Sequence, residues 1–189
     1  MFAVNVITLL CLMSVSRSAP LGCEDLLRPL DQLDPRHLEG RRVLVAGGMT
    51  NLLHVDYFKS RDSASINFAN ASESSKMSFT RIFGYGDSCQ YLYSNITLGA
   101  SSFTYDQVNL TVLFLPTSCP DCLVMRINNE TKEPLRLYLF SRRREVEQKE
   151  MEEFRNQVEC LKLLPPVMMD HTKELCPEQS NRHSAASED

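Results

Sequence analysis

Two cysteines separated by two residues have the spacing in this chain that points most directly to chemistry. Cys119 and Cys122 form a C-x-x-C motif, which acts as a redox centre in thioredoxin-like proteins because a helix N-terminus lowers the pKa of the first thiol. Here the segment Leu123–Ile127 predicts a β-strand instead of a helix. We therefore interpret the pair as a structural disulfide at the tip of a hairpin.

No other catalytic or metal-binding pattern stands out in the sequence. The four histidines are scattered, and none has zinc-ligand spacing to a cysteine pair. The chain contains no G-x-S-x-G, no H-E-x-x-H and no phosphate-binding loop. We therefore expect a protein that is not an enzyme and that needs no cofactor and no metal.

Two arginines in otherwise apolar strands point to a binding site. Alternation places Arg81 on the face of Phe79, and Arg136 on the face of Tyr138. A charged side chain is rarely buried without a partner, so each arginine either lies at a wet rim or awaits an acceptor. The candidate ligand-binding residues of this interior are Phe68, Phe79, Arg81, Phe83, Phe103, Tyr105, Val112, Phe114, Met125, Arg136 and Tyr138.

Short strands must position these residues. Asp34 and Pro35 predict a short helix that runs to Leu38 and ends at Gly40, and Val43–Ala46 then predicts the first strand. A polar loop is expected over Met49–Asp62. Beyond it, turn residues recur about every ten positions, which is typical of an antiparallel meander. The further strands expected are Ser63–Ala69, Lys76–Tyr85, Ser88–Leu98, Ser101–Tyr105, Val108–Leu115, Leu123–Ile127 and Leu135–Ser141.

A helix is expected after the last strand. Glu145–Leu161 has apolar residues at helical spacing, and Pro165 and Pro166 end the pattern. The strand Leu135–Ser141 is apolar on both faces, so its outward leucines need a cover. We expect the helix to pack there; docking on a partner or a membrane is the alternative, which its acidic polar face disfavours.

The first residues predict a signal peptide over residues 1–18, cleaved after Ser18. Six cysteines then remain, and an even number in a secreted chain implies three disulfides among 15 possible pairings. The mature chain is mildly acidic, which disfavours nucleic acid and anionic membranes as partners. Four sequons predict glycosylation in solvent, at Asn70, Asn95, Asn109 and Asn129.

The order of these features resembles a lipocalin, and more narrowly the α1-acid glycoprotein (orosomucoid) branch, with which fish plasma lipocalins that bind tributyltin, saxitoxin and tetrodotoxin are grouped. The resemblance rests on LDQLDPRHLEGRRVLVAGGMTN (30–51), GDSCQYLYSNITL (86–98), RREVEQKEMEEFRNQVECLKLL (143–164) and ELCPE (174–178). It implies an all-β fold, an eight-stranded antiparallel up-and-down barrel with one C-terminal α-helix packed outside. The lipocalin domain would span residues 19–176, before a disordered polar tail at 177–189.

The resemblance also implies two disulfide pairs, Cys23–Cys160 and Cys89–Cys176, which leaves Cys119 with Cys122. The chain departs from the family in its first strand. Lipocalins typically have Gly-x-Trp there, whereas Arg42 follows Gly40 at the position of the tryptophan, and the chain has no Trp. We therefore expect the barrel floor to be closed differently.

The function that the resemblance implies is reversible binding and transport in blood plasma, by a monomer without stable membrane insertion. The ligand would be a small hydrophobic or amphipathic molecule: a lipid, a steroid, a xenobiotic, an organotin or a guanidinium toxin. A cationic toxin would need a carboxylate from a loop, such as Asp56, Asp87 or Asp106, or would rely on the faces of Tyr and Phe rings. The alternatives are an acute-phase or immunomodulatory glycoprotein that acts through its surface, and an isomerase that uses a free cysteine inside the barrel.

Overall fold

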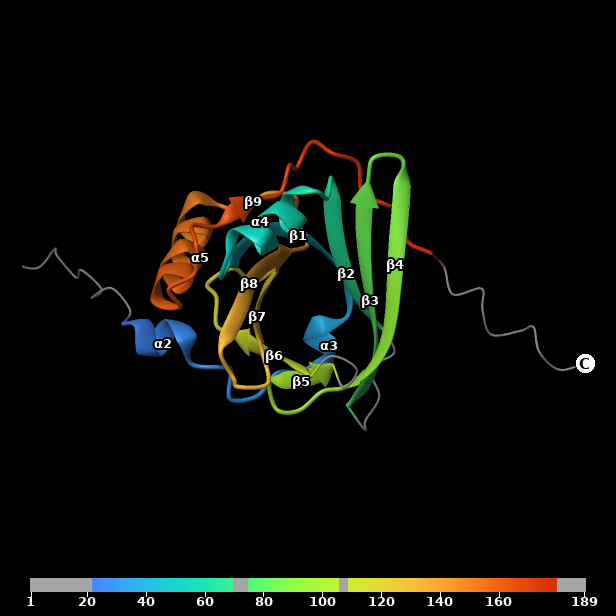
Figure 1. Cartoon of the computed structure of the whole chain (residues 1–189). Coiled ribbons are helices and arrows are strands. Elements are labelled where there is room, and N and C mark those ends of the chain that lie inside the picture. The colour runs from blue at the N-terminus through green and yellow to red at the C-terminus, as the bar shows by residue number, and fades with distance from the viewer. Residues whose placement is uncertain (1–21, 70–74, 106–108, 180–189) are drawn as a thin grey trace, which may run out of the picture.

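Eight strands form one antiparallel, nearly closed barrel in the computed structural model, which describes residues 22–69, 75–105 and 109–179 (Figure 1). The strands follow one another round the barrel in the order β4-β3-β2-β1-β8-β7-β6-β5. The lipocalin-type barrel expected from the sequence is thus confirmed. The strands are β1 (Gly40–Met49), β2 (Ser63–Ala69), β3 (Lys76–Tyr85), β4 (Ser88–Thr97), β5 (Ser102–Tyr105), β6 (Leu110–Leu115), β7 (Cys122–Asn128) and β8 (Pro134–Ser141).

The strand boundaries agree with alternation where one face of a strand is buried. The bounds of β2 and β3 are those predicted, and most of the other strands differ by one or two residues at an end. The first strand is longer than the expected Val43–Ala46, because the chain is already extended from Gly40. Gly40 has φ +91°, and a Cβ there would lie 3.0 Å from Nη1 of Arg142, so glycine is required at this turn.

The polar loop expected over Met49–Asp62 is wrong, because Leu52–Lys59 forms helix α4. Asn51 caps the helix, and its side chain accepts a hydrogen bond from the backbone N–H of His54 at 3.0 Å. Phe58 anchors α4 against the barrel. A Cβ at Gly47 would lie 2.7 Å from the Phe58 ring, so the glycine allows the helix to sit directly on β1.

The short helix expected before the barrel is α3 (Pro35–Leu38), with Asp34 as its N-cap. It lies at the end of the barrel opposite α4, since β1 leads from one helix to the other. Arg42, only 1% exposed, donates hydrogen bonds to the carbonyl oxygens of Leu38 at 2.6 Å and His37 at 2.5 Å. The floor is therefore closed by a guanidinium that caps a helix, at the position where the family's tryptophan would pack.

Burial of this guanidinium has an electrostatic cost. Burial, together with the nearby Arg142, lowers the pKa of Arg42 to about 10, although Asp121 acts in the opposite direction. The two carbonyl acceptors at the end of α3 offset this cost, because helix C-termini carry partial negative charge.

Helix α5 (Gln148–Cys160) covers the outside of β8 and β1 (Figure 1). Its residues Met151, Phe154 and Val158 share one buried cluster with Leu137 and Leu139 of β8. The predicted cover of the leucine face is thus correct. None of the helices in the described part of the chain is long and apolar enough to cross a membrane.

Two further elements were not expected from the sequence. Helix α2 (Cys23–Leu27) packs beside α5, where Gln157 donates to the carbonyl of Leu26 at 3.1 Å and to that of Pro116 at 2.8 Å. Strand β9 (Val167–Met168) pairs with β1. Both elements lie in segments that are too short to show periodicity.

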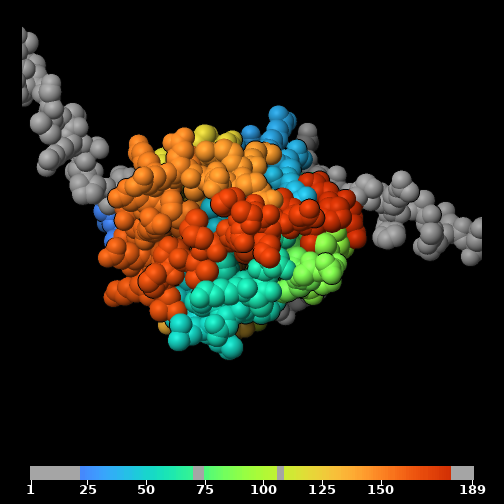
Figure 2. All heavy atoms as spheres, turned by 90° about the horizontal axis from the view of Figure 1, so that it is seen from above, coloured from blue at the N-terminus to red at the C-terminus, as the bar shows by residue number. Residues whose placement is uncertain are grey.

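The C-terminal segment after β9 crosses the surface from α5 toward β3 and β4 (red in Figure 2). Arg41 and Arg144 donate hydrogen bonds to its backbone, at the carbonyls of Cys176 (2.6 Å) and of His171 and Lys173 (both 2.5 Å). The three disulfides join the pairs that the resemblance implies, Cys23–Cys160, Cys89–Cys176 and Cys119–Cys122.

Some expectations fall on parts of the chain outside the described residues. These are the signal peptide over 1–18, the sequon at Asn70, Asp106, and residues 180–189 of the predicted tail. Within the tail, 177–179 are described and hydrogen-bonded. Tyr91 donates to the carbonyl of Pro177 at 2.9 Å and Tyr93 to the side chain of Gln179 at 2.6 Å.

Candidate functional site

A cavity of about 170 Å³ occupies the half of the barrel beneath α4. An apolar cavity of about 150 Å³ already holds a molecule the size of benzene, so this space accepts a ring or a short length of chain. Its wall is mostly aromatic and aliphatic. The lining residues are Leu44, Tyr57, Arg61, Ala64, Ser65, Ile66, Phe79, Arg81, Phe83, Leu92, Tyr105, Leu110, Met125, Ile127, Arg136, Tyr138 and Phe140.

Seven of the candidate ligand-binding residues line this cavity. They come from β3, β5, β7 and β8, and alternation places their side chains inward. Leu44, Ile66, Leu110, Ile127 and Phe140 lie on the same predicted inward faces. The seven candidates are Phe79, Arg81, Phe83, Tyr105, Met125, Arg136 and Tyr138.

The other four candidates, Phe68, Phe103, Val112 and Phe114, lie outside the cavity lining and are buried in the barrel core. The rings of Phe68, Phe103 and Phe114 form a packed aromatic cluster with Phe79, and the rings of Phe68 and Phe79 are stacked with their centres 4.5 Å apart. Alternation identifies a face but not a depth along the barrel. The structure therefore places these four in the packed floor beneath the cavity.

Sequence reasoning missed Tyr57 and Arg61, which reach the cavity from α4 and from the turn after it. They were missed because the segment was taken as a loop. Asn51, a good N-cap before an apolar run, was the available signal. Ala64, Ser65 and Leu92 also line the cavity without having been predicted.

Arg61 is held between two aromatic rings. Its guanidinium lies 4.4 Å from the ring centre of Tyr57 and 4.3 Å from that of Phe83. Burial lowers the pKa of Arg61, but hydrogen bonds to the Tyr57 and Tyr85 side chains outweigh it, so the net pKa is raised. The same contact lowers the pKa of Tyr57, chiefly through the hydrogen bond to Arg61. The Arg61 guanidinium is therefore a fixed cation at the cavity.

Arg81 and Arg136 add two more positive charges. The Arg81 guanidinium lies 4.8 Å from the ring centre of Tyr105, and burial raises the pKa of Tyr105, so its phenol stays neutral. The Nε atoms of Arg61, Arg81 and Arg136 are buried and have no hydrogen-bond partner among the described residues. The Nε atoms of Arg42 and Arg143, outside the cavity lining, are in the same state, so this feature is not particular to the cavity.

Carboxylates do not balance these charges within the cavity. Among the residues that the structure describes, the lining includes three arginines and neither Asp nor Glu. Asp56 and Asp87 are exposed and lie outside the lining, and Asp106 is outside the described ranges. The described cavity thus suits an anion better than a cation.

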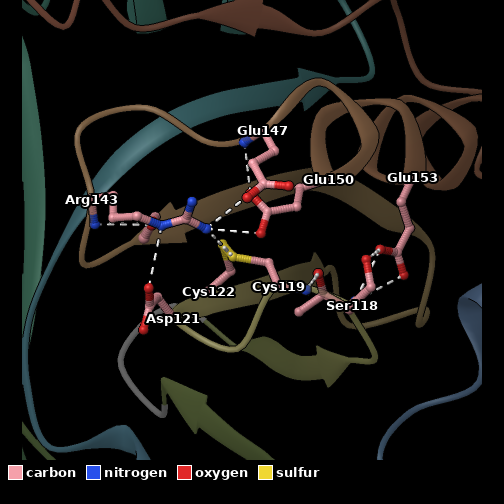
Figure 3. A network of polar contacts seen from close by, with 10 residues as sticks. Ser118, Cys119, Asp121, Cys122, Arg143, Glu147, Glu150 and Glu153 are labelled. Atoms are coloured by element: carbon pink, nitrogen blue, oxygen red, sulfur yellow. Dashed lines mark hydrogen bonds and ion pairs between the residues drawn. A yellow bond between two sulfur atoms is a disulfide. The ribbon is translucent and has the colours of Figure 1, made fainter.

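The C-x-x-C motif lies between β6 and β7, away from the cavity lining (Figure 3). Cys119 and Cys122 form a disulfide, each is 2% exposed, and a strand follows, as predicted. Arg143 donates to Cys119 Sγ at 3.2 Å and to both carboxylate oxygens of Glu150, at 2.8 and 2.9 Å. Arg143 thus connects the disulfide at the start of β7 to the first turn of α5, which agrees with a structural role for the disulfide.

Three sequons fall within the described residues. Asn95 is exposed on β4, and Asn109 is exposed with its side chain donating to Glu130 at 2.6 Å. Asn129 is half-buried, and its side-chain oxygen accepts from Thr131 at 2.8 Å. Occupancy of all these positions stays a prediction.

Comparisons with known proteins agree with the geometry. The family model of the ApoM domain, a lipocalin family, matches residues 31–180. The chain is similar to the solved siderocalin Ex-FABP, with 15% identity and a TM-score of 0.57 over 77% of this chain and 97% of that one. It is also similar to siderocalin Q83, with 12% identity and a TM-score of 0.64 over 77% of this chain and 96% of that one.

At such low identity these two structures support the fold alone. The first is described as functioning through dual ligand specificities, and the second as having a dual ligand binding mode. No curated protein sequence matches the chain. In the described part of the chain, no group of three or more His, Cys, Asp or Glu side chains could hold a metal ion.

Proposed function

The chain belongs to the ApoM domain family of lipocalins, and we propose that it binds a small amphipathic molecule with an anionic head and carries it reversibly. The apolar part of the ligand lies against the aromatic wall of the barrel. The head is held by Arg61, Arg81 and Arg136. Members of the lipocalin family are typically binding and transport proteins, and the proposal requires no bond to be made or broken.

The arrangement of the three arginines carries this proposal. Three guanidinium groups share one apolar cavity whose described lining has no acid. Buried charges are normally paired, so three guanidinium groups without a carboxylate in that lining favour an external anion. A carboxylate, phosphate or sulfate head pairs with them and offsets the positive charge.

The same arrangement weighs against some ligands that the lipocalin resemblance implies. A guanidinium toxin would meet three like charges in the described lining. Neutral steroids and organotins would fill the apolar part but leave the guanidinium groups without an anion. Among the ligand classes considered, anionic lipids therefore fit the cavity best.

Three disulfides and the predicted signal peptide favour an extracellular carrier. Blood plasma as the compartment, glycosylation and a monomeric state are parts of the same proposal. All six cysteines of the described residues are paired, and Cys11 falls in the predicted signal peptide. An isomerase that depends on a free thiol is therefore not favoured.

The test is a binding titration with matched probes. A dansyl-labelled undecanoic acid and the corresponding dansyl-labelled undecanol differ only in the head group. We expect Arg81→Met combined with Arg136→Met to weaken binding of the acid by about 10–100-fold for each hydrogen bond lost, and to change binding of the alcohol little.

Arg126→Met is the matched control, because Arg126 is on β7 outside the cavity lining, with its Nε donating to Asn128 at 2.8 Å. It should leave both affinities unchanged. Equal affinity of the parent protein for acid and alcohol would contradict the role of the arginines. Absence of binding to either probe and to a panel of lipids would contradict the carrier function itself.

A further inference from the structure

Helix α4 presents an exposed apolar surface, the rim patch, made of Leu52, Leu53 and Tyr57. Their side chains are 70%, 76% and 50% exposed. These are three of the five large apolar residues that the described chain leaves in solvent, and the other two, Tyr93 and Met168, lie on strands β4 and β9. Single exposed apolar side chains are ordinary, whereas a group on one element marks an interaction surface.

The leucines of the rim patch are held outward by the packing of the opposite face of α4. Val55 and Phe58 are 7% and 1% exposed and fix that face to the barrel. A helix with only one face covered normally carries polar residues on the other. Here LLHVDYFK is apolar on both faces, so the outer leucines have no role in the barrel core.

The rim patch continues into the ligand cavity. Tyr57 belongs to both, because it lines the cavity and is half exposed, and Arg61 follows one turn later. An apolar path therefore leads from the outer leucines to the cavity wall. In Figure 2 the segment that contains α4, in cyan, projects from the surface beside the red C-terminal segment.

The charges around the patch suit a zwitterionic surface. Thr50 and Asn51 are uncharged, and Asp56 and Lys59 of α4 balance each other. Burial and the nearby Arg136 lower the pKa of His54, so the imidazole is neutral at pH 7. The exposed residues of α4 therefore form neither a basic cluster that recruits anionic lipids nor a net negative charge, and the guanidinium groups of Arg61, only 7% exposed, and Arg136 lie in the cavity lining beneath them.

We propose that the rim patch docks the barrel mouth on a zwitterionic phospholipid surface, where Leu52 and Leu53 enter the interface and the ligand passes between lipid and cavity. Transfer of ligand depends on the function proposed above, but docking of the empty protein does not. Two leucines give weak, reversible attachment, as a carrier that must leave the surface requires.

Docking is measured first, without ligand. The secreted full-length protein is mixed with sucrose-loaded phosphatidylcholine vesicles and sedimented, and its intact mass establishes where the chain begins. We expect Leu52→Ser combined with Leu53→Ser to lower the partition coefficient by about tenfold for each leucine. The control, Tyr93→Ser, removes an exposed apolar side chain from β4, on the barrel wall, and should change partitioning little.

Transfer is measured second, with dansyl-labelled undecanoic acid loaded in the same vesicles. Because docking requires collision, the transfer rate should rise with vesicle concentration in the parent protein, and this rise should be lost in the leucine variant. The affinity for the probe added from buffer should stay the same, since neither leucine lines the cavity.

Three results would overturn docking: a parent protein that stays in the supernatant at millimolar lipid, an equal loss of partitioning in the control variant, or a parent dimer that the leucine substitutions dissociate. The dimer would assign the patch to a second copy of the chain. If vesicles bind the parent protein and not the leucine variant while neither binds the probe, docking stands and the anionic-ligand function fails.

Discussion

Replacement of Arg42 by methionine tests whether a guanidinium can close the floor of this barrel. Methionine keeps much of the buried volume but removes the two donors to the carbonyls of His37 and Leu38. Hydrogen bonds from charged groups contribute about 1.5–3 kcal/mol each, and the Leu38 carbonyl would be left buried without a donor. The substitution also removes the cost of burying a charge, which is up to several kcal/mol.

We expect the hydrogen bonds to prevail, because both contacts are short; Arg142 also donates at this helix end, but to the carbonyl of Glu39, at 2.8 Å. The free energy of unfolding should fall by about 2–4 kcal/mol in Arg42→Met. For a domain of this size that corresponds to a fall of about 5–15 °C in Tm. Non-reducing urea unfolding followed by circular dichroism, with an unchanged m-value, measures the difference directly.

Arg42→Lys separates charge from geometry. Lysine retains the positive charge, but its ammonium is a point donor without the planar fork that reaches both carbonyls. Its stability should lie between those of the parent and Arg42→Met. A methionine variant as stable as the parent, or more stable, would refute the reasoning, since the cost of burying the guanidinium would then exceed the gain from capping α3.

Two further predictions concern the disulfides and the pH dependence of binding. Chain-entropy estimates give about 5 kcal/mol for the Cys23–Cys160 disulfide, which spans 137 residues, and about 2 kcal/mol for Cys119–Cys122, which spans 3. Replacing Cys23 and Cys160 by serine should therefore lower the Tm far more than replacing Cys119 and Cys122. Equal losses would show that contacts of the folded state, and not loop length, determine the effect. The pKa of Tyr57 is lowered by Arg61, so its phenolate forms before a normal tyrosine would ionise and competes for that cation. Affinity for dansyl-undecanoic acid should therefore fall as pH rises toward 10, and Tyr57→Phe should remove this fall; an unchanged pH profile in the variant would exclude the competition.

The sequence was sufficient to predict most of the barrel wall, because alternation reports directly on a strand with one buried face. Arg81 and Arg136 were recognised as cavity residues for the same reason. Alternation does not show how far along the barrel axis a side chain lies. Phe68 and Phe114 were therefore predicted to contact the ligand, whereas they lie outside the cavity lining, in the barrel floor. Helix α4 was missed because it is apolar on both faces and shows no clean helical period, and Arg61 was lost with it.

The role of Arg42 was only half predictable. Its position in place of a tryptophan showed that the floor must be closed in another way. That its guanidinium caps α3 depends on how the chain before β1 folds back across the barrel, which neither composition nor spacing reveals.

The disulfide Cys89–Cys176 also determines how the barrel can change its width. Strands β4 and β5 stand at the two ends of the hydrogen-bonded order, so widening the seam between them breaks no sheet ladder among the described residues. From the other side, the C-terminal segment ties β4 to β1 through Cys176, whose carbonyl accepts from Arg41. The β4–β5 side is therefore the part of the barrel wall that no described strand ladder holds, whereas the wall from β4 to β1 is held both by the sheet and by the C-terminal segment.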